Sequence, residues 1–548
     1  MKFLLMKISF LLFLFTQFII AQEYNKTVFN IEIASESIKE NTRVLASDIF
    51  EGRGTGTTGG NLAAKYIASE FAKYGLKPVG QENSFYQNIP MHGSYPLKSS
   101  ELKIYSDDDE IFLELDKDYL LYKSGQQTFT PVPLPLVFVG FGIVAPEYDY
   151  NDYQEIDVEG KIVVFLDGEP ESDDPEFFNG EAPTVYNYPI SKQRIALSRG
   201  AAGSILIPDI LNSSWEKIVD EFAFEDINLA YSASNNLSLI INPDEVDHIF
   251  KNSEFDYAWI LAMKYEHTLK SFPLNVSLTF KGEYLQRDFL AQNVAGMLEG
   301  SDTDLKDSYL IISAHYDHLG IGPVVNGDSI YNGALDNAIG VSVLLELARQ
   351  FSESNKSVKR SIIFLAVTGE EKGLLGSTYY TDNPLVPLYK TIANLNIDGI
   401  AFFRDFQTVV GVGSELSSLE NILSETAIKM GLQVEPIPQQ FKVVEAFNQS
   451  DQLSFASAGI PSILVLEGTK NKNKSEEEVL YAFIDYMINR YHTPFDDLSQ
   501  DIDYVAAAQH TGILFELAFS IVNSETVPEW KAGSPFINAR LRSIAEKK

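Results

Sequence analysis

The 548-residue sequence contains no cysteine. This absence excludes disulfide bonds, zinc sites built from thiolates, thiol nucleophiles and lipid attachment to an N-terminal cysteine. Basic residues are also scarce, because 42 lysines and arginines stand against 76 aspartates and glutamates, which gives a net charge of −34. A surface this negative repels a phosphate backbone, so we expect no nucleic acid among the partners.

Long apolar runs are scarce as well, and the clearest one is short. Residues 8–20 form an apolar run that follows Lys2 and Lys7, and the small residue Ala21 comes directly after it. Charged, apolar and small residues in this order are typical of a secretory signal peptide. The run is short for a membrane span, and an uncleaved anchor is the alternative. We therefore expect residues 1–21 to be removed, leaving an exported protein, periplasmic or extracellular, without stable membrane insertion.

The composition that remains is that of a large globular protein. Hydrophobic residues make up 45% of the chain, aromatic residues 12% and charged residues 22%. Such a chain has enough apolar material to form cores, and it is too long for one ordinary domain. We therefore expect at least two folded units.

The pattern of expected strands, turns and helices divides the chain into segments. Residues 128–284 contain short alternating strands and turns, which indicate a β-rich module. Residues 22–127 and 285–523 flank this module, and after residue 292 strands and helices alternate. That alternation predicts an α/β domain with a mixed, mostly parallel central sheet flanked by helices. The β-rich module is therefore predicted to be an insertion into this domain, and residues 524–548 are predicted to form a C-terminal tail.

Polar clusters follow three predicted strands of the α/β domain. The predicted strands span residues 309–313, 362–367 and 392–397, and the clusters that follow them are His315-Tyr316-Asp317-His318, Glu370-Glu371 and Asp398. In open α/β sheets, sites form just beyond the carboxyl ends of the strands. If these strands are neighbours in the sheet, the three clusters meet in one crevice.

Two further clusters complete a possible metal site. Asp336 precedes an apolar helix predicted over residues 338–351, and His492 follows a helix predicted over residues 478–489. Taken singly, Asp336 could be a helix cap and His492 a structural histidine. Three of the seven histidines lie in these clusters, and with the carboxylates they make a thiol-free donor set suited to zinc or a similar divalent ion.

The adjacent pair Glu370-Glu371 strengthens the metal interpretation. Neighbouring side chains of an extended loop point apart, so one carboxylate can bind a metal while the other stays free as a base. Two carboxylates side by side would repel each other unless a cation lies near them. The pair therefore predicts both a metal ligand and a general base.

The order of these motifs resembles the co-catalytic di-zinc aminopeptidases, whose superfamily also contains glutamate carboxypeptidases, glutaminyl cyclases and the transferrin receptor. The segments that carry the resemblance are 315–317, 333–337, 370–377, 396–399 and 491–494, within residues 292–522 and with a further region at 48–78. One departure is Leu335, where many relatives have a polar residue.

The resemblance implies a role for each residue of the site. His315 and Asp398 would hold one zinc ion, and Glu371 and His492 would hold the other. Asp336 would bridge the two ions, and the peptide bond after it would be cis.

The resemblance also assigns residues to the reaction itself. Glu370 would be the general base, and Asp317 would orient His315. Tyr491 would donate a hydrogen bond to the substrate carbonyl oxygen. Asp451 would contact the substrate amine, with a helix cap as the alternative for this residue.

The inserted module resembles a protease-associated domain, on the segments Tyr150-Asn151-Asp152-Tyr153 and Gly200-Ala201-Ala202-Gly203. Together these resemblances imply a secreted zinc aminopeptidase that removes N-terminal residues from peptides. A metallo-carboxypeptidase or a glutaminyl cyclase on the same scaffold is an alternative, and so is a catalytically silent binding protein. Two zinc ions are expected, other divalent ions being possible. Side-chain preference and oligomeric state are left open.

Overall fold

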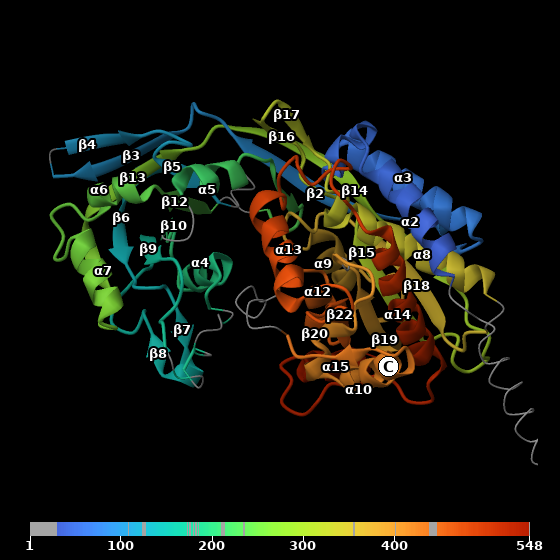
Figure 1. The fold of residues 1–548 in the computed structure, drawn as a ribbon. Helices are drawn as coiled ribbons and strands as arrows, with labels where there is room; N and C mark the ends of the chain where they lie inside the picture. The colour runs from blue at the N-terminus through green and yellow to red at the C-terminus, as the bar shows by residue number, and fades with distance from the viewer. Residues whose placement is uncertain are drawn as a thin grey trace, which may run out of the picture.

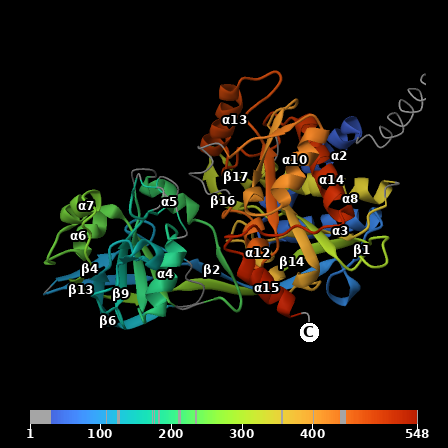
Figure 2. The same cartoon turned by 90° about the horizontal axis from the view of Figure 1, so that it is seen from below.

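The computed structural model describes residues 30–107, 109–122, 128–172, 174, 177–178, 180, 184, 186–209, 214–233, 236–354, 357–399, 402–437 and 447–546. The segment predicted to be a signal peptide lies outside these residues. Two β-sheets lie side by side in the molecule, each with its own hydrophobic core (Figures 1 and 2). We call the part built around the larger sheet the main domain, and residues 101–281 the second module.

The main domain is built on a ten-stranded sheet. From one edge to the other it runs β11 (Asp226–Leu229), β2 (Tyr86–Pro96), β14 (Tyr284–Leu298), β18 (Ser361–Val367), β15 (Tyr309–His315), β19 (Thr391–Asn396), β22 (Ser462–Glu467), β20 (Thr408–Val412) and β21 (Gln433–Val434), while β1 (Lys77–Pro78) pairs with β14 beside this path. The sheet is mixed, with the four parallel strands β18, β15, β19 and β22 at its centre. The predicted α/β class and the three predicted central strands are confirmed.

The central strands are apolar throughout because both of their faces are covered. Leu310 and Ile312 of β15 pack into the core on one side, whereas Ile311 packs into the core on the other side. The first face is covered by α2 (Ile31–Leu45), α3 (Thr58–Lys73), α8 (Ile339–Glu353), α10 (Leu419–Lys429) and α14 (Tyr504–Asn523). The opposite face is covered by α9 (Leu375–Asp382) and α12 (Gln452–Ser457).

Helix α14 is long and apolar enough to cross a membrane by length and composition alone. In the structure, however, 72% of its most apolar window is buried. The helix packs against α2 and α8 and supplies many side chains of the main core. We therefore describe α14 as a core helix of the main domain.

The second module is built on an eight-stranded sheet. Its order is β4 (Asp109–Leu113), β3 (Glu101–Ser106), β13 (Phe272–Lys281), β6 (Phe129–Phe138), β9 (Ile162–Leu166), β10 (Gly203–Ile207), β12 (Leu237–Ile241) and β5 (Tyr119–Leu121). Its helices are α4 (Pro189–Ser198), α5 (Trp215–Glu221), α6 (Val246–Ile249) and α7 (Tyr257–Tyr265), and the short pair β7 (Val144–Ala145) and β8 (Tyr150–Asn151) lies apart from the sheet.

The pairing of strands corrects the expected start of the inserted module. The sequence analysis placed residues 101–121 with the N-terminal part of the main domain, but β3, β4 and β5 pair with strands of the second sheet. Because β3 to β5 are short and separated by turns, they resemble surface strands of either unit when only the local sequence is read. The module is inserted between β2 and β14, which are neighbours in the main sheet. Its strand β11 returns to pair with β2.

The C-terminal part of the chain packs on the main domain. Helix α13 (Glu476–Asn489) begins with a capping box between Ser475 and Glu478. Beyond α14, the indole nitrogen of Trp530 donates a hydrogen bond of 2.9 Å to the carbonyl of Gly459. The chain then forms α15 (Ile537–Ala545), and the backbone of Arg540 lies against Gly459. The segment predicted as a tail is thus integrated into the main domain as far as residue 546.

Candidate metal centre

The site lies where the central parallel strands end. Strand β15 ends at His315, β18 is followed by Glu370 and Glu371, and β19 is followed by Asp398. Strand β15 lies between β18 and β19, and parallel strands place their carboxyl ends at one edge of the sheet. The three polar clusters therefore meet, as the sequence analysis predicted for neighbouring strands.

The five predicted ligands come together around Asp336. Asp336 Oδ1 lies 3.3 Å from His315 Nε2, and Asp336 Oδ2 lies 3.4 Å from His492 Nε2. Asp398 Oδ1 lies 3.2 Å from His315 Nε2, and Glu371 Oε2 lies 3.0 Å from His492 Nε2. Each oxygen of Asp336 thus faces a different histidine, which is the arrangement that a bridging carboxylate requires.

The donor set fits divalent zinc. Ligand atoms of His315, Asp336 and Glu371 lie within 4.8 Å of one another, and so do those of His315, Glu370 and Asp398. Imidazole nitrogens and carboxylate oxygens are the ligands of thiol-free zinc sites. In addition, His492 Nε2 lies 3.0 Å from Glu371 Oε2 and 3.4 Å from Asp336 Oδ2, so one imidazole nitrogen faces two carboxylates, as it would around a shared metal ion.

The electrostatics reflect a crowd of buried acids. Burial and the neighbouring carboxylates of Asp398 and Glu371 hold the pKa of Glu370 well above its usual range, although His315 opposes them. Burial disfavours the charged form of His492, but Glu371 and Asp336 outweigh burial and raise its pKa to about 10. Such a concentration of negative charge is stable only with nearby cations.

The backbone at Asp336 is held in place by the side chain of Asp496. The peptide bond between Asp336 and Asn337 is cis, as the resemblance implied. The carboxylate of Asp496 accepts hydrogen bonds from the backbone N–H groups of Leu335 and Asp336, both at 3.0 Å. The hydroxyl of Tyr486 donates to Asp496 over 3.1 Å. Asp496 could not be given a role from the sequence, since a surface turn and a buried turn look alike in sequence.

The carboxylate of Asp317 contacts the backbone of Glu370 more closely than the ring of His315. Its Oδ1 lies 3.8 Å from His315 Nδ1, which is too long for a hydrogen bond, and that nitrogen lies 3.2 Å from the Asp317 backbone carbonyl. The same carboxylate accepts hydrogen bonds from the Glu370 backbone N–H at 3.2 Å and from the Thr55 hydroxyl at 3.0 Å. Asp317 therefore fixes the start of the Glu370-Glu371 loop, a contact that the sequence analysis did not anticipate.

His318 is a second contact that the sequence analysis missed. It is fully buried, and its Nδ1 lies 2.6 Å from Glu371 Oε1, while His492 lies on the other oxygen of Glu371. The signal was present, because His318 stands in the same cluster as His315, but only the fold places it against Glu371.

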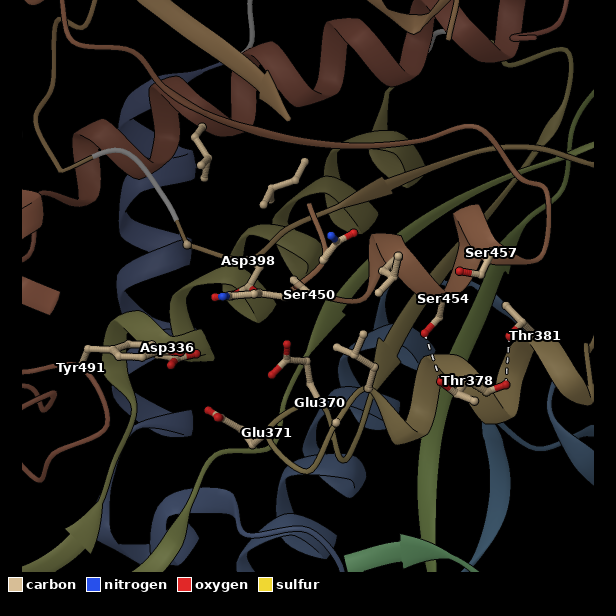
Figure 3. Close-up of a pocket in the computed structure, with 18 of the residues that line it drawn as sticks. Asp336, Glu370, Glu371, Thr378, Thr381, Asp398, Ser450, Ser454, Ser457 and Tyr491 are labelled. Carbon is tan, nitrogen blue, oxygen red and sulfur yellow. Dashed lines mark hydrogen bonds between the residues drawn. The ribbon is translucent and has the colours of Figure 1, made fainter. Parts of the chain in front are cut away.

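A cavity of about 1090 Å³ opens over these groups. The carboxylates of Asp336, Glu370 and Glu371 turn toward a common space at its wall (Figure 3). Tyr491 also lines the cavity and stacks on His492, with 3.8 Å between ring centroids. Other parts of the wall are apolar and include Leu335, Leu374, Phe402, Leu466, Phe483 and Met487. Ile190 and Arg194 of α4 reach the same cavity from the second module.

Asp451 lies beneath the cavity rather than on its wall. The side chain is fully buried, and neither carboxylate oxygen has a hydrogen-bond partner among the described residues. Burial raises its pKa to about 7, against the opposing effect of His315. Ser450 and Leu453, on either side of it in sequence, do line the cavity. In this arrangement, direct contact between Asp451 and a substrate amine is not possible without movement.

Comparisons with known proteins identify relatives of the main domain. Residues 293–518 match the model of Peptidase family M28. Aminopeptidase YwaD of Bacillus subtilis is 28% identical over 237 residues, which are 41% of this chain and 45% of that protein. A probable zinc metalloprotease of Pyricularia oryzae is 36% identical over 108 residues, 20% of this chain and 19% of that protein. The chain thus matches less than half of the length of either relative.

A solved structure extends the likeness in fold over most of the molecule. The aminopeptidase from Aneurinibacillus sp. strain AM-1 aligns over 91% of this chain and 98% of its own, with a TM-score of 0.53 and 18% sequence identity. The residues that match Peptidase family M28, 293–518, contain the central parallel strands and the cluster of imidazoles and carboxylates at their ends. Over these residues the chain is similar to that family.

Proposed function

We propose that the protein is an exported zinc aminopeptidase that hydrolyses the N-terminal residue from peptides. The observation that carries the proposal is that Asp336 faces both His315 and His492 directly beside the free carboxyl group of Glu370. The printed names of the relatives, an aminopeptidase and a probable zinc metalloprotease, support it. Export rests on the signal-peptide pattern of residues 1–21.

The chain supplies the ligands for the metal pair. His315 and Asp398 would hold one zinc ion, Glu371 and His492 the other, and Asp336 would lie between the two. When bound, the ions supply Lewis acidity toward the scissile carbonyl and toward a water molecule. Asp317, His318 and Asp496 keep Glu370, Glu371 and Asp336 in position through the contacts described above.

Glu370 moves the proton in this proposal. Its carboxylate takes a proton from the attacking water, and the oxygen of that water forms the bond to the peptide carbonyl carbon. Glu370 then returns the proton to the leaving amine as the carbon–nitrogen bond breaks, so the base is regenerated.

Tyr491 stabilises the developing negative charge on the carbonyl oxygen. Burial, together with the carboxylates of Asp336 and Glu371, holds the pKa of Tyr491 well above its usual range. The phenol therefore stays protonated at neutral pH and remains a hydrogen-bond donor. A donor already placed at the cavity wall is what transition-state stabilisation requires.

The second module would restrict access to the cavity in the manner of a protease-associated domain. Ile190 and Arg194 of α4 line the cavity opposite residues of α15 and α13. A cavity lined by both parts of the molecule suits the free end of a peptide better than an internal segment of a folded chain. This role favours an exopeptidase.

The test compares a free-amine aminoacyl anilide with its N-acetylated form, each with and without a chelator. The proposal predicts hydrolysis of the free amine alone, loss of that activity with the chelator and recovery with zinc. Equal cleavage of the acetylated substrate would remove the aminopeptidase assignment and favour another activity on the same scaffold, such as a carboxypeptidase or a glutaminyl cyclase. Failure of zinc-loaded protein to cleave any peptide would favour a binding protein.

A further inference from the structure

Arg53 is a fully buried arginine at the metal centre that no step of the proposed reaction uses. Arg53 ends a short 3-10 helix, η1 (Asp48–Arg53), which is kinked at Glu51 and Gly52. We call residues 51–56 the loop; it precedes the second module and is more than 250 residues from the nearest proposed metal ligand in sequence. Burial lowers its pKa to about 10, although Asp496 and Asp336 oppose this effect, so the guanidinium is charged at neutral pH. A buried charge is retained only where its contacts compensate for the loss of water.

The guanidinium of Arg53 donates to backbone carbonyls of two metal-binding segments. Its Nε donates to the carbonyl of Tyr316, which follows His315, over 2.8 Å. Its Nη2 donates to the carbonyl of Gly333 over 2.8 Å and to that of Asp336 over 3.4 Å. Its Nη1 donates to Leu45, over 2.9 Å, and to Asn332. One planar group thus ties the loop after β15 to the segment that carries Asp336.

The rest of the loop makes contacts of the same kind. The hydroxyl of Thr55 donates to Asp317, Gly54 forms a backbone bridge with His318, and the His318 N–H points to the Arg53 carbonyl over 3.4 Å. A side chain on Gly52 would lie 2.4 Å from the carbonyl oxygen of Tyr331, so the loop is packed directly against the segment that precedes Asn332. These contacts reach the same two segments, at Asp317 and His318 after His315 and at Tyr331 before Asp336.

We propose that Arg53 is a positioning residue for the metal centre, which holds the segments of His315 and Asp336 at the separation that two zinc ions require. The proposal rests on the metal roles given to these two residues, and it concerns the affinity for zinc rather than the chemical step. Only a guanidinium offers five donors in one rigid plane, so a lysine at this position retains the charge but cannot join all the carbonyls.

The test compares Arg53→Lys with Arg360→Lys. Arg360 is the matched control, because it is also buried and donates to backbone carbonyls, those of Val522 and Ser524, but it precedes β18 at the end opposite to Glu370. Zinc affinity is measured by competition with a chromogenic chelator, and folding by circular dichroism and urea unfolding. Supporting contacts behind metal ligands are worth about 10- to 100-fold in affinity.

We expect Arg53→Lys to weaken zinc binding at least tenfold relative to Arg360→Lys at comparable stability. Equal zinc affinity of the two folded variants would overturn the proposal. If Arg53→Lys does not fold, Arg53→Gln is measured in its place against Arg360→Gln, because the amide keeps a planar donor group but cannot reach both segments: weaker zinc binding than that of Arg360→Gln supports the positioning role, and equal affinity refutes it. Since the readout is zinc binding, a protein that binds zinc but cleaves no peptide would refute the proposed function alone.

Discussion

The main domain and the second module both bury charged groups, but they use them differently. In the second module, the ammonium of Lys192 donates to the carbonyls of Leu166 and Gly168, and Asp152 accepts from the Ile143 N–H and the Tyr150 hydroxyl. These charges are compensated within the module. In the main domain the buried acids crowd together at strand ends and face a cavity. Buried charge that the protein does not itself compensate indicates a ligand, whereas compensated charge indicates a structural role.

Parallel strands alone do not create the site. Strands β9, β10 and β12 of the second module are parallel neighbours, as are the central strands of the main domain. The apolar residues of β10 and β12 are followed by no cluster of histidines and adjacent glutamates. Function therefore resides in the side chains at the strand ends and not in the strand arrangement.

The largest effect should come from the proposed base in the main domain. Glu370→Gln removes the group that is proposed to carry the proton, so we expect kcat to fall about 10²- to 10⁴-fold with zinc content unchanged. Steady-state kinetics and metal analysis of the same preparation check this. Near-normal turnover would show that Glu370 is not the base. Asp152→Asn in the second module is the matched control and should keep kcat within about threefold, since the module supplies no catalytic group.

A smaller effect on kcat is expected when the hydroxyl of Tyr491, the proposed hydrogen-bond donor, is removed. Tyr491→Phe keeps the stacked ring on His492 but removes the phenolic donor, so kcat should fall about 100-fold with little change in KM. A rise in KM with unchanged kcat would mean instead that Tyr491 binds the substrate and the transition state equally well. Zinc content should stay at the parent level.

Two buried groups, His510 in the main domain and Asp152 in the second module, should respond to acid with opposite signs. His510 is buried in the main core beside the Val465 carbonyl, and burial lowers its pKa to about 4 from 6.5. Its stabilising contribution is present above pH 6.5 and is lost as the pH falls toward 4, so acidification from pH 7 to 5 should remove about 2 kcal/mol of the contribution that His510 makes. We expect His510→Gln to reduce the change in the free energy of unfolding between pH 7 and pH 5, measured by urea unfolding with a chelator present. An unchanged pH dependence in this variant would show that His510 does not contribute to it.

Asp152 of the second module should respond in the opposite direction and slightly more weakly. Burial raises its pKa to about 6 from 3.8, with the Ile143 N–H and the Tyr150 hydroxyl opposing the shift. Its contribution is greatest below pH 3.8 and is lost as the pH rises through 6, so the module should gain about 1 kcal/mol between pH 7 and 5.

Tryptophan fluorescence can follow this module during urea unfolding, because Trp215 and Trp259 lie in it and Trp530 is the remaining tryptophan of the chain. Asp152→Asn should abolish the difference between pH 5 and pH 7. If the variant retains the parent's pH dependence, another group controls it. If His510→Gln and Asp152→Asn changed the pH dependence of the free energy of unfolding in the same direction, the predicted contrast between the two regions would be contradicted.

The fold of the main domain and much of its site could be predicted from local sequence. The apolar runs that end at His315 and Val367 predict buried parallel strands, and the polar clusters stand at the ends of these runs. The start of the second module could not be predicted, because its first strands pair at long range. Strand β3 pairs with β13 and β5 pairs with β12, each more than 100 residues away along the chain. Whether a short strand joins one sheet or another depends on long-range pairing, which local patterns do not contain.

The sequence by itself determined which chemical groups are available: a chain without thiols, a set of imidazoles and carboxylates at predicted strand ends, and a pair of adjacent glutamates. The tertiary structure alone decided which groups touch. It buried Asp451 below the cavity, placed His318 on Glu371 and brought Arg53 under two distant segments. The physical reason is that the identity of a side chain is local, whereas its burial and its hydrogen-bond partners depend on how distant segments pack.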